Sequence, residues 1–110
     1  MEVAVDMNER EKQVYELVSE VVDPEIGIPI SVMNLIDEVR VDGDRAFVAF
    51  HLSTPMCPLL FAVKIGTDIY LQAMKAEGVK EVEVKVRGHF YEEQINQEIS
   101  EAIARLKGSR

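Results

Sequence analysis

The chain has 110 residues, 47% of them hydrophobic, which suits a single domain over 1–110 with a modest core. Twenty aspartates and glutamates against 12 lysines and arginines give a formal net charge of −8. Such an excess repels phosphate, so nucleic acid is not expected as a partner. The longest apolar stretches are too short and too interrupted by charge to cross a bilayer, so no membrane role is expected either.

The chain contains one cysteine, Cys57, which cannot close a disulfide within the molecule. Its first residues have neither the basic region nor the apolar region of a secretory signal. Both features favour the reducing cytoplasm as the compartment. We expect residues 1–7 to be flexible, because they precede the first helix signal.

The first helix is predicted to begin at Asn8. This residue is a good N-cap and Glu11 lies three positions on, which approximates a capping box. Apolar residues then recur at helical spacing until about Val22, after which a proline disfavours helical geometry. An ordered loop is expected over 23–30, followed by a short helical turn over 31–35.

A β-hairpin is predicted from two strand-like runs, 36–41 and 45–52, which are joined by an Asp-Gly pair, a strong turn signal. A long helix is predicted over 58–77, and it carries more apolar residues than one buried stripe needs. Residues 80–87 alternate apolar with charged side chains, as a strand with one wet face does. An amphipathic helix is expected over 92–107.

The order helix, hairpin, helix, strand, helix predicts a two-layer α/β (α+β) sandwich with a mixed sheet of about three strands. Because a strand–helix–strand crossover returns parallel, we expect the third strand beside and parallel to the second, which then lies in the centre. Apolar residues on both faces of the second strand fit that place. The sequence leaves open an alternative in which the third strand lies antiparallel beside the first.

Cys57 lies in the segment Leu-Ser-Thr-Pro-Met-Cys-Pro at 52–58, where the second predicted strand meets the long helix. Pro58 suits the first position of a helix, which places Cys57 at or beside the N-cap. The positive end of the helix dipole favours a thiolate, the form of cysteine that ligates metals and attacks electrophiles. The alternative interpretation is a small buried hydrophobe.

The segment Asp23-Pro24-Glu25 also fixes polar side chains on a proline-stiffened backbone. If this loop folds over the start of the long helix, Asp23 or Glu25 lies near Cys57. A carboxylate opposes a thiolate unless a cation is shared, so such a pair favours metal capture over free nucleophilic chemistry. Alternatively, Asp23 only closes an Asx-turn and Glu25 is solvated surface.

The two histidines give weaker signals. His51 shares a strand face with Phe47 and is interpreted as a core or interface residue, and His89 follows a glycine in a turn, where we expect it exposed. A thiol protease built from Cys57, His51 and Glu25 is disfavoured, because the chain is short for a substrate cleft with an oxyanion hole.

Together the two segments resemble a known family. The string Asp-Pro-Glu-Ile-Gly at 23–27, an Ile-x-Ile step, and the string at 52–58 are similar to the small iron–sulfur cluster assembly (FSCA) domain proteins of the SufT and PaaD-like group. The resemblance extends from the first helix to the last. It implies a non-catalytic accessory role in the maturation of iron–sulfur proteins, as a cluster carrier or as an adaptor that delivers clusters to targets.

In that family the two loops form the proposed site, which carries over to this chain as Asp23, Glu25, Ser53, Thr54 and Cys57. Cys57 and Glu25 are then candidate ligands of a metal or cluster, and the other three support the site. One cysteine cannot hold a cluster that takes about four. The implied cofactor is thus a transient iron–sulfur cluster or iron, and the implied partners are iron–sulfur scaffold, carrier or target proteins.

Two segments depart from the family pattern. Over 31–37 the family usually reads Val-Asp-Leu-Gly-Leu-Val-Tyr, whereas this chain reads Ser-Val-Met-Asn-Leu-Ile-Asp, which leaves the role of that segment in partner recognition open. The family's Pro-Trp before the last helix appears here as His89-Phe90. This pair keeps an aromatic side chain but loses the indole.

The surplus of apolar residues on the long helix predicts an interface, and a two-fold dimer is the commonest way to close one. We therefore expect a homodimer or a stable complex with an assembly partner. The predicted contact residues are Phe61 and Ile65, or the face of Phe47, Ala49 and His51, with Leu60 and Leu71 at the flanks. Two alternatives to cluster assembly remain open: a pure interaction module whose acidic surface docks a basic partner, and a thiol enzyme with Cys57 as nucleophile.

Overall fold

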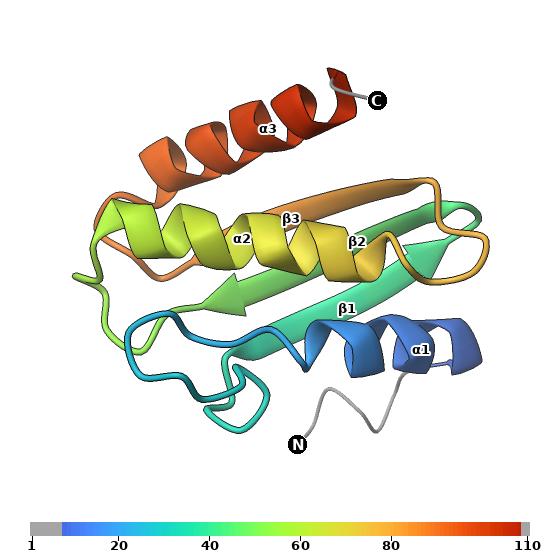
Figure 1. The fold of residues 1–110 in the computed structure, drawn as a ribbon, viewed down its shortest axis with the longest axis horizontal. Coiled ribbons are helices and arrows are strands. Elements are labelled where there is room, and N and C mark those ends of the chain that lie inside the picture. Colours follow the sequence, from blue (N-terminus) through green and yellow to red (C-terminus); the bar gives the residue numbers. More distant parts are fainter. Residues whose placement is uncertain (1–7, 109–110) are drawn as a thin grey trace.

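The computed structural model describes residues 8–108, and the expected flexibility of residues 1–7 lies outside this part of the chain. Within it, the helices and strands follow in the predicted order (Figure 1). They are α1 (Glu9–Val18), β1 (Ile36–Asp42), β2 (Arg45–His51), α2 (Leu59–Ala73), β3 (Glu81–Arg87) and α3 (Glu92–Gly108). None of the described helices is long and apolar enough to span a membrane.

The strands of the described residues form one mixed sheet in the order β1-β2-β3. β1 and β2 pair as an antiparallel hairpin, with Val39 opposite Val48, while β2 and β3 run parallel, with Val48 opposite Val84. The central place of β2 and the parallel return of β3 are therefore confirmed. The alternative with the third strand antiparallel beside the first is wrong.

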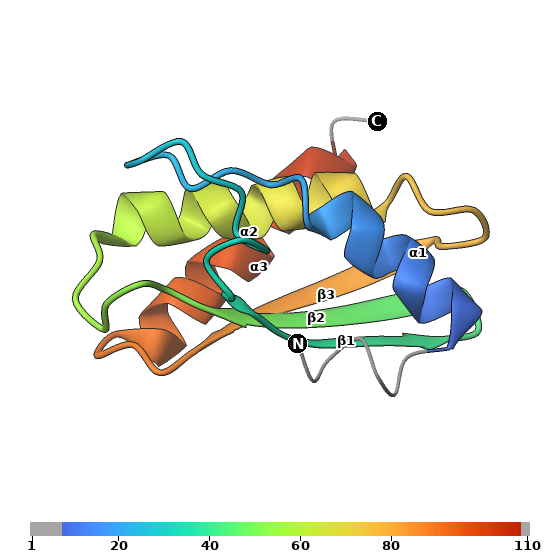
Figure 2. The ribbon, with the colours of Figure 1, turned by 90° about the horizontal axis from the view of Figure 1, so that it is seen from below.

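The helices form a second layer over one face of the sheet (Figure 2). α2 crosses that face between α1, which packs on β1, and α3, which packs on β3 (Figure 1). Because it has a helix on either side, α2 buries a broad stripe of side chains that includes Ile65 and Ile69. Ile65, one of the surplus apolar residues from which an interface was predicted, is thus buried within the chain. Leu60 and Leu71 remain exposed.

The other face of the sheet is covered by charged side chains. Phe47 in β2 lies between the guanidinium groups of Arg40 and Arg87, whose Cζ atoms are 5.8 and 6.0 Å from the ring centroid. Glu38 forms ion pairs with both arginines, at 2.5 Å to Arg40 and 2.9 Å to Arg87. Ala49, on the same face, is fully buried. This second predicted dimer face is therefore largely covered by the chain's own side chains.

α1 begins at its predicted cap but ends early. The side chain of Asn8 accepts from the N–H of Glu11 at 2.9 Å, and the carboxylate of Glu11 accepts from the N–H of Asn8 at 3.1 Å, which completes the capping box. The helix ends at Val18 rather than near Val22, because the backbone of Val22 forms an antiparallel bridge with Pro29. That bridge folds the following loop back on itself.

Candidate functional site

Cys57 lies in the loop between β2 and α2, at the end of the molecule where β2 and β3 both end (Figure 1). Pro58 is the N-cap of α2, so Cys57 stands beside the N-cap, as predicted. The residue is buried, with 7% of its surface exposed. The structure therefore confirms the place of Cys57 at a helix start and shows that its side chain is also buried.

Asp23 organises the loop that follows α1. Its carboxylate accepts a hydrogen bond from the N–H of Glu25 at 2.8 Å, which is an Asx-turn. Its own carbonyl accepts from the N–H of Gly27 at 2.8 Å, and Gly27 adopts a φ of 73°, in the left-handed region that favours glycine. Asp23 is buried, with 3% of its surface exposed, and its carboxylate bonds to the backbone of its own loop.

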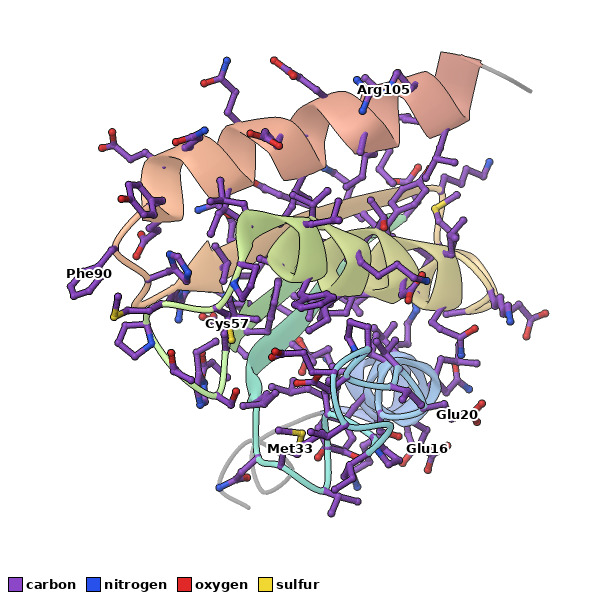
Figure 3. The ribbon with its side chains drawn as sticks, turned by 60° about the vertical axis from the view of Figure 1, so that its left-hand side comes forward. Glu16, Glu20, Met33, Cys57, Phe90 and Arg105 are labelled. Atoms are coloured by element: carbon purple, nitrogen blue, oxygen red, sulfur yellow. The ribbon has the colours of Figure 1, made fainter. Side chains whose placement is uncertain are left out.

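This loop brings Glu25 to the thiol, as expected for a loop folded over the start of α2. Oε1 of Glu25 lies 4.0 Å from Sγ of Cys57, and Oγ of Ser53 lies 3.7 Å from the same sulfur. Two oxygen atoms from two separate loops therefore flank one sulfur atom. Figure 3 shows Cys57 near the start of α2, at the same end of the molecule as Phe90.

Thr54 supports the same loop in a different way. Its hydroxyl accepts a hydrogen bond from the N–H of Met56 at 2.8 Å, which closes the turn before Cys57. The hydroxyl nearest the sulfur belongs to Ser53 instead. The structure thus brings together Cys57, Glu25 and Ser53, whereas Asp23 and Thr54 bond to the backbones of the two loops.

His89 was expected to be exposed, and this expectation is wrong, because the residue is 8% exposed. Its Nδ1 lies 2.9 Å from the backbone nitrogen of Tyr91, and its Nε2 lies 2.8 Å from the carbonyl oxygen of Cys57. Since Nδ1 accepts from the Tyr91 N–H, the ring proton is on Nε2, which donates to Cys57. The N–H of Phe90 also donates to the carbonyl of Pro55, at 3.1 Å. Two hydrogen bonds therefore tie the turn before α3 to the Cys57 loop.

His51 lies apart from this arrangement. Its Nδ1 is 2.8 Å from Oδ1 of Asp37, and 40% of its side chain is exposed. The contact of His51 is with Asp37, while Glu25 is the carboxylate at Cys57. The sequence-based option of a protease triad from Cys57, His51 and Glu25 gains no support from this geometry.

The assembled groups define the chemistry that this end of the molecule can offer. A thiol sulfur is a soft ligand, a carboxylate is a hard ligand, and a hydroxyl can donate a hydrogen bond to sulfur. Within residues 8–108, no cluster of three or more His, Cys, Asp or Glu side chains is placed to hold a metal ion. The site thus presents one thiol and one neighbouring carboxylate on each copy of the chain.

Comparison with known proteins identifies the family. The model of the iron–sulfur cluster assembly protein family matches residues 11–86, a range that includes both site loops. The uncharacterized protein MJ1129 of Methanocaldococcus jannaschii is 40% identical over 83 residues, which cover 74% of this chain and 84% of that protein. The chain belongs to the iron–sulfur cluster assembly protein family, and the resemblance noted in its sequence is confirmed.

Solved structures support the fold. The crystal structure of a domain of unknown function, DUF59, from Bacillus anthracis matches with a TM-score of 0.66 and 24% identity, over 92% of this chain and 97% of that chain. This match confirms the compact α+β architecture. A solution structure from Mycobacterium tuberculosis, of a protein associated with iron–sulfur complex assembly and repair, matches with a TM-score of 0.43 and 26% identity. It covers 74% of this chain and 72% of that chain.

Proposed function

We propose that this protein is a non-catalytic accessory factor of the SufT and PaaD-like kind, which acts in the cytoplasm in the assembly or delivery of iron–sulfur clusters. The observation that carries the proposal is the convergence of Glu25 and Ser53, from two separate loops, on the single thiol of a chain in this family. Cys57 is the soft ligand, Glu25 is the hard ligand, and Ser53 donates a hydrogen bond to the sulfur.

The cluster is cargo in this proposal. Iron–sulfur clusters are held by about four cysteine thiolates or a near variant, and one copy of the chain supplies one. The remaining ligands come from a scaffold, carrier or target protein that contacts the Cys57 loop. The carboxylate of Glu25, 4.0 Å from the sulfur, fits a shared cation better than a free thiolate.

A homodimer was predicted from the sequence, and it stays a prediction. Two of the contact residues expected from the sequence, Ile65 and Ala49, are buried within the chain. On α2 a dimer contact is therefore left with the exposed apolar residues, such as Leu71. Light scattering at micromolar concentration decides this point, because a monomer there would contradict it.

Anaerobic reconstitution with iron and sulfide tests the proposed function. We expect the wild type to gain a sulfur-to-iron charge-transfer absorption that Cys57→Ser lacks, and Glu25→Gln to gain a several-fold weaker one. The matched control is Glu16→Gln, which makes the same change of charge on an exposed position of α1 and should behave as the wild type (Figure 3). Equal absorption in the wild type and Cys57→Ser would contradict the proposal and favour the interaction module.

A further inference from the structure

Three loops meet at the end of the molecule that carries Cys57, and we propose that this end docks a different protein that presents an apolar pocket rimmed by lysine or arginine. The loops span 19–35, 52–58 and 88–91, and we call their joint surface the loop end (Figures 1 and 2). The inference deepens the proposed function, on which it rests, by giving the chemistry of the partner and the surface that it uses.

Large apolar side chains are unusually exposed at the loop end. Met56 is 72% exposed, Phe90 is 70% exposed, and Leu60 in the first turn of α2 is 78% exposed. Ile26, next to Glu25, is 57% exposed. These residues come from the three loops and the first turn of α2, around one buried thiol, and clustered apolar exposure on a folded protein marks an interaction site.

The loops that display these side chains are held by hydrogen bonds. Phe90 is fixed by its N–H bond to the carbonyl of Pro55 at 3.1 Å, and its neighbour His89 bonds to the carbonyl of Cys57 at 2.8 Å. The thiol links this pair of segments to the third loop through Glu25. The apolar side chains are thus presented on a preorganised backbone, which lowers the entropic cost of binding.

Charge determines the kind of partner. The segments 19–39, 46–63 and 88–104 contain no lysine or arginine, whereas Glu25, Glu92 and other acids lie within them. The cations that border these segments are occupied, since Lys64 pairs with Asp68 at 2.7 Å and Arg87 pairs with Glu38 at 2.9 Å. An apolar surface with an acidic rim is complementary to an apolar pocket with a basic rim.

The same charge excludes other occupants. Nucleic acid and anionic lipid surfaces repel an acidic rim. A second copy in a two-fold contact would place the same acids opposite each other, because such an interface uses one patch twice. A different, basic-rimmed protein is the occupant that remains, and its docking would bring its ligands beside Cys57.

Site-specific photo-crosslinking tests this inference. The photoreactive amino acid benzoylphenylalanine replaces Phe90 or Leu60 in the full chain, with Leu71 as the matched control, since Leu71 is also an exposed apolar residue of α2, 46% exposed, but lies in its last turn. After irradiation in an extract of the protein's own cells, adducts are mapped by mass spectrometry.

We expect positions 60 and 90 to give the same protein adduct and position 71 not to give it. The cross-linked peptide of the partner should carry or flank lysine or arginine. Added salt and the substitution Glu93→Lys at the start of α3 should each lower the yield several-fold, because both weaken a contact between exposed charges. Glu101→Lys, farther along α3, is the control for charge alone.

Several results would overturn the inference: an adduct of two copies of this chain, an adduct to nucleic acid, an acidic partner peptide, no adduct at all, or equal yields at 71 and 90. The same cross-links in Cys57→Ser separate the two proposals. Adducts that persist there, together with a wild type that binds no iron, would refute the proposed function and leave the docking surface standing. Iron binding without these adducts would refute the docking surface and leave the proposed function standing.

Discussion

His89 connects the turn before α3 to the loop that carries Cys57, and its two ring nitrogens have separate tasks. Nε2 donates to the carbonyl of Cys57 and Nδ1 accepts from the N–H of Tyr91. Glutamine can place its amide nitrogen near the position of Nε2, and asparagine can place its oxygen near that of Nδ1. The two substitutions therefore remove one bond each.

We predict that His89→Gln leaves Cys57 as protected as in the wild type, whereas His89→Asn exposes it. Loss of one hydrogen bond weakens the closed loop by about 1–1.5 kcal/mol, so alkylation of Cys57 by iodoacetamide should become up to about tenfold faster. The rate at fixed pH and the thermal midpoint are both measured. Equal rates in the two variants, or a rate that only follows the midpoint, would show that His89 does not position the loop.

At this scale the sequence predicted part of the site. The approach of Glu25 to Cys57 could be inferred, because two proline-stiffened loops flank helices at compatible places. The role of His89 could not, because its partner Cys57 lies 32 positions away and a histidine after glycine looks like a surface turn. The hydroxyl of Ser53, and not that of Thr54, lies beside the sulfur. This difference depends on the path of the loop, which cannot be read from the residue types.

α2 and α3 pack closely against each other at Gly66. A Cβ atom built on Gly66 in α2 would lie 2.6 Å from Cδ1 and 2.9 Å from Cγ1 of Ile99, which is fully buried in α3. Two helices can approach this closely only where one lacks a side chain. Gly66 is therefore a packing position, although glycine weakens a helix interior by about 1 kcal/mol.

We predict that Gly66→Ala lowers the free energy of unfolding by about 1–2 kcal/mol, because overpacking of about 1–3 kcal/mol exceeds the gain in helix propensity. Ile99→Val removes Cδ1 and should recover part of the loss in the double variant, a non-additive result. Denaturant midpoints of the four proteins complete the cycle. A stabilised Gly66→Ala would mean that the helices move apart without cost.

Element order and strand pairing were predictable, and element ends were less so. The capping box at Asn8 is a local signal, and it correctly located the start of α1. The end of α2 was expected near Glu77, but the helix stops at Ala73 and a turn follows before Gly78. Where a helix stops depends on the tertiary path of the chain, which helical periodicity does not encode.

In the molecule as a whole, side chains of the chain itself cover both edges of the sheet. On the outer edge of β1 the N–H of Val41 donates to the carboxylate of Glu11 at 3.0 Å, and on β3 the side chain of Asn96 bonds to both the N–H and the carbonyl of Val86 at 2.7 and 3.1 Å. Side chains thus occupy positions on both sheet edges that an added strand would use. With the open sheet face covered by charge, the loop end is the apolar surface best placed for a partner.

Under the proposed function the Cys57 loop holds iron–sulfur cargo, and the most direct measurement is the iron and sulfide content of the protein purified without oxygen from its own cells. We predict that the wild type carries both iron and acid-labile sulfide, that Cys57→Ser carries neither, and that the control Glu16→Gln matches the wild type. Equal contents in the wild type and Cys57→Ser, or none in either, would contradict the proposed function.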